Sequence, residues 1–205
     1  MLGLLNKRRK IWEQMGSLAR IPKISFIGTF TSSPNGKFHI AVMDGDGIGR
    51  AGRRKKARGR YVLFTDHKIV ATGKLERPNF PAVADNGTFC IQDWMFDTRK
   101  SHLQGTFYVF SRKGKRLAKR YFKANLMNSA ISADGKYAAV ATAASPKEKD
   151  SATLEIYELP RGKAVFSEQI GLVTSMAFDS ETGNLKVAVS AVGNLIFDPR
   201  AGKQL

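Results

Sequence analysis

Residues 130–142 read AISADGKYAAVAT, which is two short apolar segments joined by a turn at Asp134-Gly135. Three further segments repeat this arrangement: FTSSPNGKFHIAV at 30–42, AVADNGTFCIQDW at 82–94 and AFDSETGNLKVAV at 177–189. Glycine adopts a positive φ without a steric penalty, so a glycine turn between two apolar runs predicts a β-hairpin. The sequence therefore predicts four strand–turn–strand units.

Two series of landmarks recur at nearly constant intervals along the chain. The turn glycines lie 51, 48 and 48 residues apart, at Gly36, Gly87, Gly135 and Gly183. Aromatic residues that end a later strand of each repeat lie 46, 47 and 40 residues apart, at Phe64, Phe110, Tyr157 and Phe197. A period of roughly 40–50 residues built from short strands is typical of a β-propeller, in which each repeat forms one blade.

We therefore expect an all-β fold of four repeats, each with about four antiparallel strands, at 22–76, 77–124, 125–170 and 171–205. The last blade is expected to be incomplete, because the chain ends at Leu205 where its fourth strand should begin. An unpaired strand edge invites further pairing. Three arrangements stay open: a closed four-bladed ring, a homodimer joined through open blade edges, or part of a longer propeller.

Residues 1–21 stand outside these repeats and form a domain of their own in this interpretation. Apolar residues recur there near helical spacing, and the basic run KRRK at 7–10 lies mostly on another side. This pattern predicts a short basic amphipathic helix.

The third repeat carries a family resemblance. The pattern S-x-D-G-K-Y-A-A-V, followed by L-E-I-Y-E-L-x-x-G-K, resembles the degenerate repeat of WD-repeat and YVTN-like propellers, with Asp134, Gly135, Lys136, Gly162 and Lys163 as the matching residues. The Gly-His and Trp-Asp signatures of true WD repeats are absent, and Asp93-Trp94 has the reverse order. The resemblance covers roughly residues 22–205 and implies a scaffold that binds other macromolecules.

Charge is concentrated in three short stretches. The chain carries 34 basic and 17 acidic residues, a formal net charge of +17. Residues 7–10, 50–60 and 112–123 contain 18 of the basic residues and no acidic one, which leaves the rest of the chain nearly neutral. Localised positive charge favours acidic partners.

The strongest candidate site is the glycine-rich basic segment 43–60, between two strands of the first repeat, together with the run at 7–10. Such cations could neutralise the charge of an acidic protein or of phosphates. The residues expected to contact an anionic partner are Arg50, Arg53, Arg54, Lys55, Lys56, Arg58, Arg60, Lys7, Arg8, Arg9 and Lys10. A secondary basic patch is expected at Arg112, Lys113, Lys115 and Arg116. In either place the cations could equally form a solvated surface with no dedicated ligand.

Other chemistry finds little support in the sequence. Asp44-Gly45-Asp46-Gly47 resembles half of a calcium loop, but cations follow it and the remaining ligands are missing, so no metal site is expected. The three histidines lie in different repeats, without the spacing of metal ligands. Nucleophile elbows and Walker loops are absent. Asp93 and Asp97 are read as acids that cap turns, and Cys90 as a buried apolar residue.

We therefore expect a non-enzymatic scaffold without cofactors that binds a macromolecular, acidic partner through basic loops. A protein is the expected partner, and the alternative is sequence-independent binding of nucleic acid or ribonucleoprotein as the main role. No apolar run approaches the roughly 18–20 residues that cross a bilayer, and with a single cysteine a cytoplasmic location is expected.

Overall fold

The computed structural model describes residues 10–44, 59–95, 104–145 and 147–205. Four antiparallel sheets follow one another along the chain, and the only helical turn in these ranges is the short 3-10 helix η1 at Pro22–Ile24. The strand order within each sheet follows the sequence, as repeated up-and-down blades require.

The first sheet contains six strands, β1 to β6, in sequence order. They span Glu13–Met15, Leu18–Ile21, Phe26–Ser32, His39–Met43, Gly59–Phe64 and Ile69–Leu75. The second sheet contains β7 to β10, at Pro78–Val83, Phe89–Met95, Gln104–Phe110 and Arg116–Phe122.

The third and fourth sheets have four strands each. Strands β11 to β14 span Leu126–Ile131, Tyr137–Thr142, Thr153–Glu158 and Lys163–Gln169. Strands β15 to β18 span Val173–Phe178, Leu185–Val189, Gly193–Asp198 and Lys203–Gln204. The expectation of a missing last strand is thus corrected, because the two residues of β18 pair with Phe197 and Asp198 of β17.

Both series of sequence landmarks occupy equivalent places in the four sheets. Each turn glycine lies in the connection that follows β3, β7, β11 or β15, and all four have positive φ, at 69°, 85°, 71° and 74° for Gly36, Gly87, Gly135 and Gly183. The aromatic residues Phe64, Phe110, Tyr157 and Phe197 lie at or near the end of β5, β9, β13 and β17, and all are buried. The two series therefore mark equivalent positions in the four sheets.

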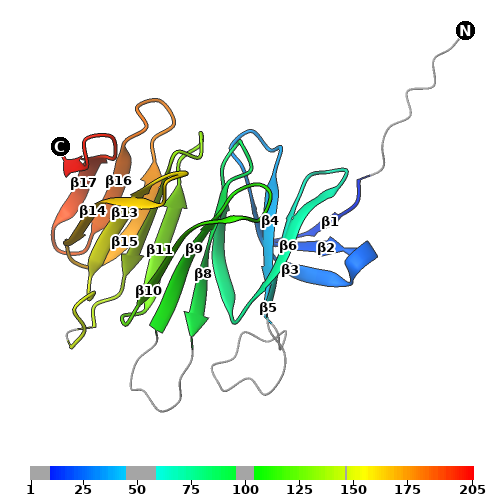
Figure 1. Ribbon diagram of the computed structural model, residues 1–205, viewed down its shortest axis with the longest axis horizontal. Helices are drawn as coiled ribbons and strands as arrows, with labels where there is room; N and C mark the ends of the chain where they lie inside the picture. Colours follow the sequence, from blue (N-terminus) through cyan, green and yellow to red (C-terminus); the bar gives the residue numbers. More distant parts are fainter. Residues whose placement is uncertain (1–9, 45–58, 96–103, 146) are drawn as a thin grey trace, which may run out of the picture.

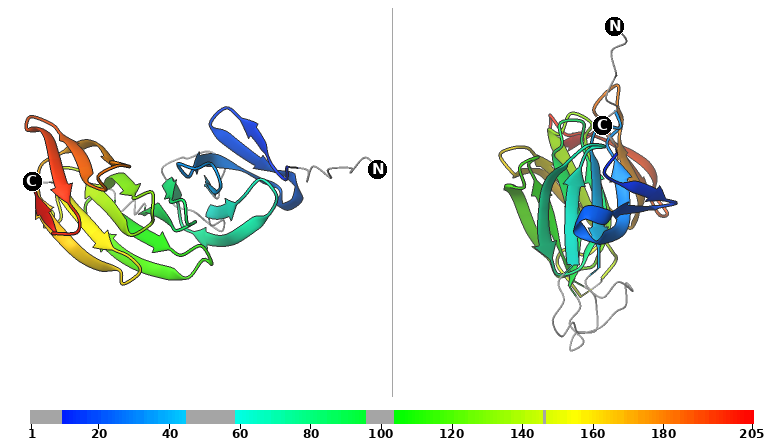
Figure 2. Two further views of the ribbon diagram at one scale, coloured as in Figure 1. Left: turned by 90° about the horizontal axis from the view of Figure 1, so that it is seen from above. Right: turned by 90° about the vertical axis from the view of Figure 1, so that its right-hand side faces the viewer.

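The sheets follow one another along an open arc (Figures 1 and 2), and the first and last sheets lie at opposite ends of it. Alternate residues of a strand point to opposite faces, so each inner sheet contributes to two apolar cores. In the first sheet, Ile40, Val42 and Leu63 pack against Phe89 and Ile91 of the second sheet. Further cores join the second sheet to the third and the third to the fourth.

The arc does not close on itself within the described chain. The first and the fourth sheet stand apart at the two ends of the arc in Figure 2. A closed four-bladed ring is therefore not the arrangement of this chain, while pairing between two copies stays a prediction.

The expected N-terminal helix is wrong over the part that the structure describes. Residues 13–21 form the hairpin β1–β2, in which Gly16 turns with a φ of 61°, and β2 pairs with the free edge of β3. Trp12 is buried with Ala19 and Ile21 against the face of the first sheet that points away from the second. Tertiary pairing with an open edge thus outweighs a weak helical periodicity. Residues 1–9 lie outside the described residues.

Candidate basic site on the turn-side rim

The sheets have two ends, and one of them concentrates short turns. We call this end the turn-side rim: the turns between the first and second and between the third and fourth repeat strands of each sheet, uppermost in Figure 1. It comprises residues 33–38, 65–68, 84–88, 111–115, 132–136, 159–162, 179–184 and 199–202. Strands β4 and β8 end, and β5 and β9 begin, at the opposite end of the sheets. Residues 45–58 and 96–103 lie outside the described residues.

Most of the primary basic site expected from sequence falls outside the described residues: Lys7, Arg8, Arg9, Arg50, Arg53, Arg54, Lys55, Lys56 and Arg58. Its two described members are both engaged. Arg60 donates from Nη2 to the carbonyl oxygen of Ser25 at 2.9 Å, and its guanidinium lies 5.5 Å from the ring centroid of Phe26. The Nζ atom of Lys10 lies 3.4 Å from Asp66 Oδ1 and 3.9 Å from the ring centroid of Trp12.

These two cations lie at different ends of the first sheet. Lys10 lies beside Asp66, which belongs to the turn-side rim. The backbone N–H of Ile11 also donates to the carbonyl oxygen of Asp66 at 2.8 Å. Arg60 contacts the turn before β3, at the opposite end of that sheet. The described parts of the two predicted basic segments are thus not brought together.

The secondary basic patch lies fully within the described structure. Arg112, Lys113 and Lys115 occupy the turn between β9 and β10, and Arg116 begins β10. All four side chains are exposed, and none forms an ion pair with another described residue. The guanidinium of Arg112 reaches the first sheet, where it lies 5.1 Å from the ring centroid of Phe38.

The guanidinium of Arg112 shares this region with two lysines, Lys37 and Lys68, that lie outside the basic segments predicted from the sequence. The three side chains line one cavity of about 400 Å³ at the junction of the first and second sheets, together with Gly36, Phe38, Thr65, Asp66 and His67. Neither lysine has a carboxylate partner among the described residues. Each lysine is an isolated cation in the sequence, so a search for basic runs passes over both.

Gly87 helps to position Arg112. Its φ is 85°, and a Cβ built there would lie 3.0 Å from Cγ of Arg112 and 3.2 Å from its Cβ and Cδ. The absence of a side chain at Gly87 therefore leaves room for the aliphatic stem of Arg112 to lie across the turn.

The carboxylate of Asp66, at the edge of this cavity, is already occupied. It accepts a hydrogen bond from Trp12 Nε1 at 2.9 Å, and Lys10 Nζ and His39 Nε2 lie 3.4 and 3.6 Å from the same oxygen. Partial burial raises the pKa of Asp66, but the Trp12 hydrogen bond and the charge of Lys10 outweigh it, so this pKa lies below its usual value. Asp66 is thus ionised at neutral pH and directed towards the N-terminal segment.

The same rim is electrically balanced in the third and fourth sheets. Three cations in these turns each have a carboxylate partner: Lys136 with Asp134 at 3.1 Å, Arg161 with Glu158 at 3.6 Å and Arg200 with Asp198 at 2.9 Å. Lys186, in β16 beside the turn at 179–184, pairs with Asp179 at 2.6 Å. A cavity of about 360 Å³ between these two sheets is lined by Asp134, Asp179 and Glu181 as well as by Lys136 and Arg200. Within the described turns themselves, unpaired positive charge therefore belongs to the first two sheets. Lys163 and Lys203, which begin β14 and β18 beside the turns, also have no ion pair with a described residue.

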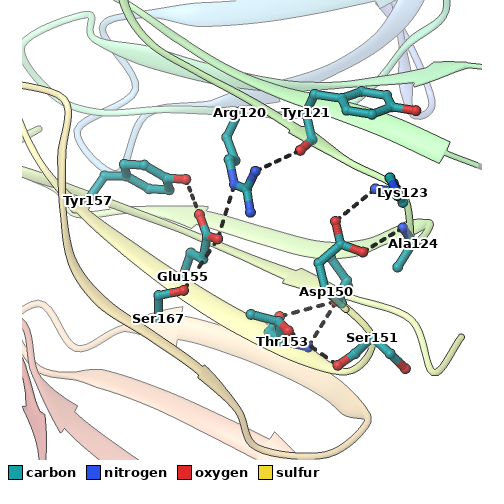
Figure 3. A network of polar contacts seen from close by, with 11 residues as sticks. Arg120, Tyr121, Lys123, Ala124, Asp150, Ser151, Thr153, Glu155, Tyr157 and Ser167 are labelled. Atoms are coloured by element: carbon teal, nitrogen blue, oxygen red, sulfur yellow. Dashed lines mark hydrogen bonds and ion pairs between the residues drawn. The ribbon is translucent and has the colours of Figure 1, made fainter. Parts of the chain in front are cut away.

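A second polar cluster joins the second and third sheets (Figure 3). Glu155 is buried and accepts hydrogen bonds from Arg120 Nε at 3.2 Å, Ser167 Oγ at 3.4 Å and the hydroxyl of Tyr157. Burial, followed by the neighbouring Glu155 carboxylate, raises the pKa of Tyr157, which keeps its phenol protonated. Donors and acceptors in this cluster satisfy one another, so it acts as a structural link between the sheets.

Two carboxylates hold the segments that connect successive sheets. Asp93 accepts the backbone N–H groups of Glu76 at 3.2 Å and Arg77 at 2.6 Å. Asp150 accepts those of Lys123 at 2.8 Å and Ala124 at 3.0 Å (Figure 3). The reading of Asp93 as a turn-capping acid agrees with this geometry, whereas Asp97 lies outside the described residues.

Within the described ranges, no three His, Cys, Asp or Glu side chains gather as the ligands of a metal ion would. A helix long and apolar enough to cross a membrane is likewise not found in the part of the chain that the structure describes.

Comparison with known proteins locates the fold. No protein-family model and no curated protein sequence matches the chain. Among solved structures, HIRA(644-1017) superposes with a TM-score of 0.56 at 18% identity, over 86% of this chain and 51% of that one. The Cps50 (Swd1) β-propeller domain of Myceliophteria thermophila gives a TM-score of 0.49 at 13% identity, over 82% of this chain and 52% of that one.

The chain thus spans about half the length of the two structures that it matches. Four successive antiparallel sheets, each with an equivalent glycine turn after its first repeat strand, provide the same architecture independently. This chain is therefore a β-propeller repeat protein by its fold.

Proposed function

We propose that this protein is a non-enzymatic scaffold that binds an acidic protein partner through the turn-side rim of its first two sheets. The observation that carries the proposal is the asymmetry of charge along the rim. Lys37, Lys68 and Arg112 share a cavity without a carboxylate partner of their own, whereas the rim cations of the third and fourth sheets are paired.

A lysine or arginine already paired with a carboxylate gives up that interaction when it binds another anion, whereas an unpaired cation has none to lose. Complementary charge also steers an acidic partner towards the face that carries the excess. The first two sheets therefore offer the favourable contact, and the last two serve as a neutral extension of the scaffold.

The test is a comparison of two triple variants. Fluorescence anisotropy would measure the affinity of a labelled peptide rich in Glu and Asp for the parent protein at about 50 and 300 mM salt. Changing Lys37, Lys68 and Arg112 to Gln should weaken binding by about tenfold, because an exposed ion pair contributes about 0.2–1 kcal/mol and tenfold corresponds to about 1.4 kcal/mol. The matched control changes Lys136, Arg161 and Arg200 to Gln and should retain affinity. Equal losses in both variants, or no binding by the parent, would contradict the proposal.

The alternative function, binding of nucleic acid as the main role, rests on the basic segment 50–60. Its distinguishing prediction is that a single-stranded oligonucleotide binds more tightly than the acidic peptide, with a steep loss of affinity as salt rises. Substitution of Arg53, Arg54, Lys55 and Lys56 by Ala should then abolish retention on the oligonucleotide, whereas the rim variant should leave it intact.

A further inference from the structure

The cavity lined by Lys37, Lys68 and Arg112 has a composition that suits one particular kind of acidic group. We infer that it takes the phosphate of a phosphorylated side chain in the bound protein partner, an inference that rests on the proposed function and sharpens it.

Three cations line this cavity, and their combined charge suits a doubly charged group. The three cations come from three separate turns: Lys37 follows β3, Lys68 follows β5 and Arg112 follows β9. A single carboxylate carries one charge and would leave much of this positive charge uncompensated. A phosphate monoester carries about −1.5 to −2 charges at pH 7 and presents three strong acceptor oxygens, which matches three cationic side chains lining one cavity. Arginine adds a planar fork of donors that suits two of those oxygens.

The ring of Phe38 lines the same cavity and contacts two of its cations. Lys37 Nζ and Arg112 Cζ lie 5.8 and 5.1 Å from the ring centroid of Phe38, which is itself buried. These cation–π contacts restrain both side chains, so less conformational entropy is lost when they bind an anion. Thr65 and the exposed His67 line the same cavity.

Asp66 is the one acid among the residues that line this cavity. Lys10 Nζ, 3.4 Å from its carboxylate, offsets its charge, so the positive charge of Lys37, Lys68 and Arg112 stays in excess. The cavity between the third and fourth sheets provides an internal comparison, because Asp134, Asp179 and Glu181 line it and would repel a phosphate. Of these two rim cavities, the one between the first and second sheets therefore has the excess positive charge that a dianion requires.

The experiment compares two labelled peptides that are identical except for one phosphoserine in place of serine. The parent protein should bind the phosphorylated peptide about tenfold more tightly or better, and inorganic phosphate should compete. The single substitutions Lys68→Gln and Arg112→Gln should remove most of this preference. Lys136→Gln serves as the control, because this equally exposed lysine is paired with Asp134, and it should leave the preference unchanged. Circular dichroism confirms that each variant is folded.

The outcomes separate this inference from the proposed function. If both peptides bind equally and the Lys68 and Arg112 variants weaken both, the phosphate inference is overturned while the acidic-partner function stands. If neither these peptides nor the Glu- and Asp-rich peptide bind, both are overturned. Tighter binding of a single-stranded oligonucleotide of equal charge than of the phosphopeptide would overturn the inference in favour of nucleic acid.

Discussion

Trp12 and Asp66 are joined across 54 residues of sequence by a hydrogen bond of 2.9 Å between Nε1 and Oδ1. The indole ring also packs edge-on against Phe30 and Phe64, with centroid distances of 5.2 and 5.3 Å. Through these contacts residues 10–21 cover the outward face of the first sheet, which in a closed propeller would pack against another blade. The chain therefore caps its own first repeat, as terminal repeats of solenoid proteins do.

Removing the Trp12 ring should uncover this face. Replacement by Ala deletes a large buried side chain and leaves the Asp66 carboxylate without its indole donor. We expect the free energy of unfolding to fall by about 3–5 kcal/mol, measured by urea denaturation. Met15→Ala is the matched control in the same hairpin, because Met15 is 49% exposed and its loss should change stability little. Similar small effects of both substitutions would show that residues 10–21 do not act as a cap.

Acidification should destabilise the protein through His39. Burial lowers the pKa of this histidine below its ordinary 6.5, more than the neighbouring Asp66 carboxylate raises it, and the charge of Lys10 lowers it further. The unfolded chain therefore binds a proton more readily than the folded one. The stability that the neutral imidazole contributes is present above pH 6.5 and is lost as the pH falls below that value.

The measurement is the free energy of unfolding between pH 7.5 and about pH 5, a range above the titration of most carboxylates. The parent should lose stability as the pH falls, and His39→Gln should flatten the curve even if it lowers the value at pH 7.5. His67→Gln is the control, because His67 is exposed. An unchanged slope in the His39 variant would contradict the assignment.

Cys90 should be chemically inert in the folded protein. Its side chain is buried, and burial raises the pKa of the thiol to about 12. The thiolate, which is the reactive form, is therefore scarcely populated at neutral pH. We expect a thiol reagent to label Cys90 only after addition of denaturant. Rapid labelling under native conditions would mean that the core between the second and third sheets opens readily.

Asp150 should contribute measurably to the junction of the second and third sheets. Its carboxylate accepts the backbone N–H groups of Lys123 and Ala124, so Asp150→Ala leaves both donors without that acceptor. We expect a loss of about 1–3 kcal/mol in the free energy of unfolding. Glu168→Ala, an exposed acid on β14, removes the same charge and should have little effect. Equal losses of stability in the two variants would mean that the change in net charge, and not the loss of the two hydrogen bonds, is responsible.

The repeat could be predicted because local and tertiary preferences agree in it. Gly36, Gly87, Gly135 and Gly183 each need a positive φ in the structure, and glycine is the residue that sequence reasoning associates with such turns. Burial of Phe64 and Phe197 at 0% exposure likewise follows from their recurrence at equivalent strand positions.

The N-terminal hairpin and the basic cavity could not be predicted, for two physical reasons. Strand β2 is extended because β3 offers it a free edge, and a pairing with a distant strand leaves no periodic signal in so short a segment. Lys37, Lys68 and Arg112 are separated by 31 and 44 residues, and only the curvature of two packed sheets brings them to one cavity. Arg112 is the one of these three residues that the sequence predicts as part of a site, because it lies in the basic run at 112–116.

The most direct test of the account is a map of backbone amide chemical shifts by nuclear magnetic resonance during titration with the Glu- and Asp-rich peptide. We predict that the largest changes occur at residues 36–38, 65–68 and 111–115, in the turns that carry the unpaired cations. Changes centred on residues 133–136, 159–162 and 199–202, or on the opposite end of the sheets, would contradict the assignment of the partner-binding surface.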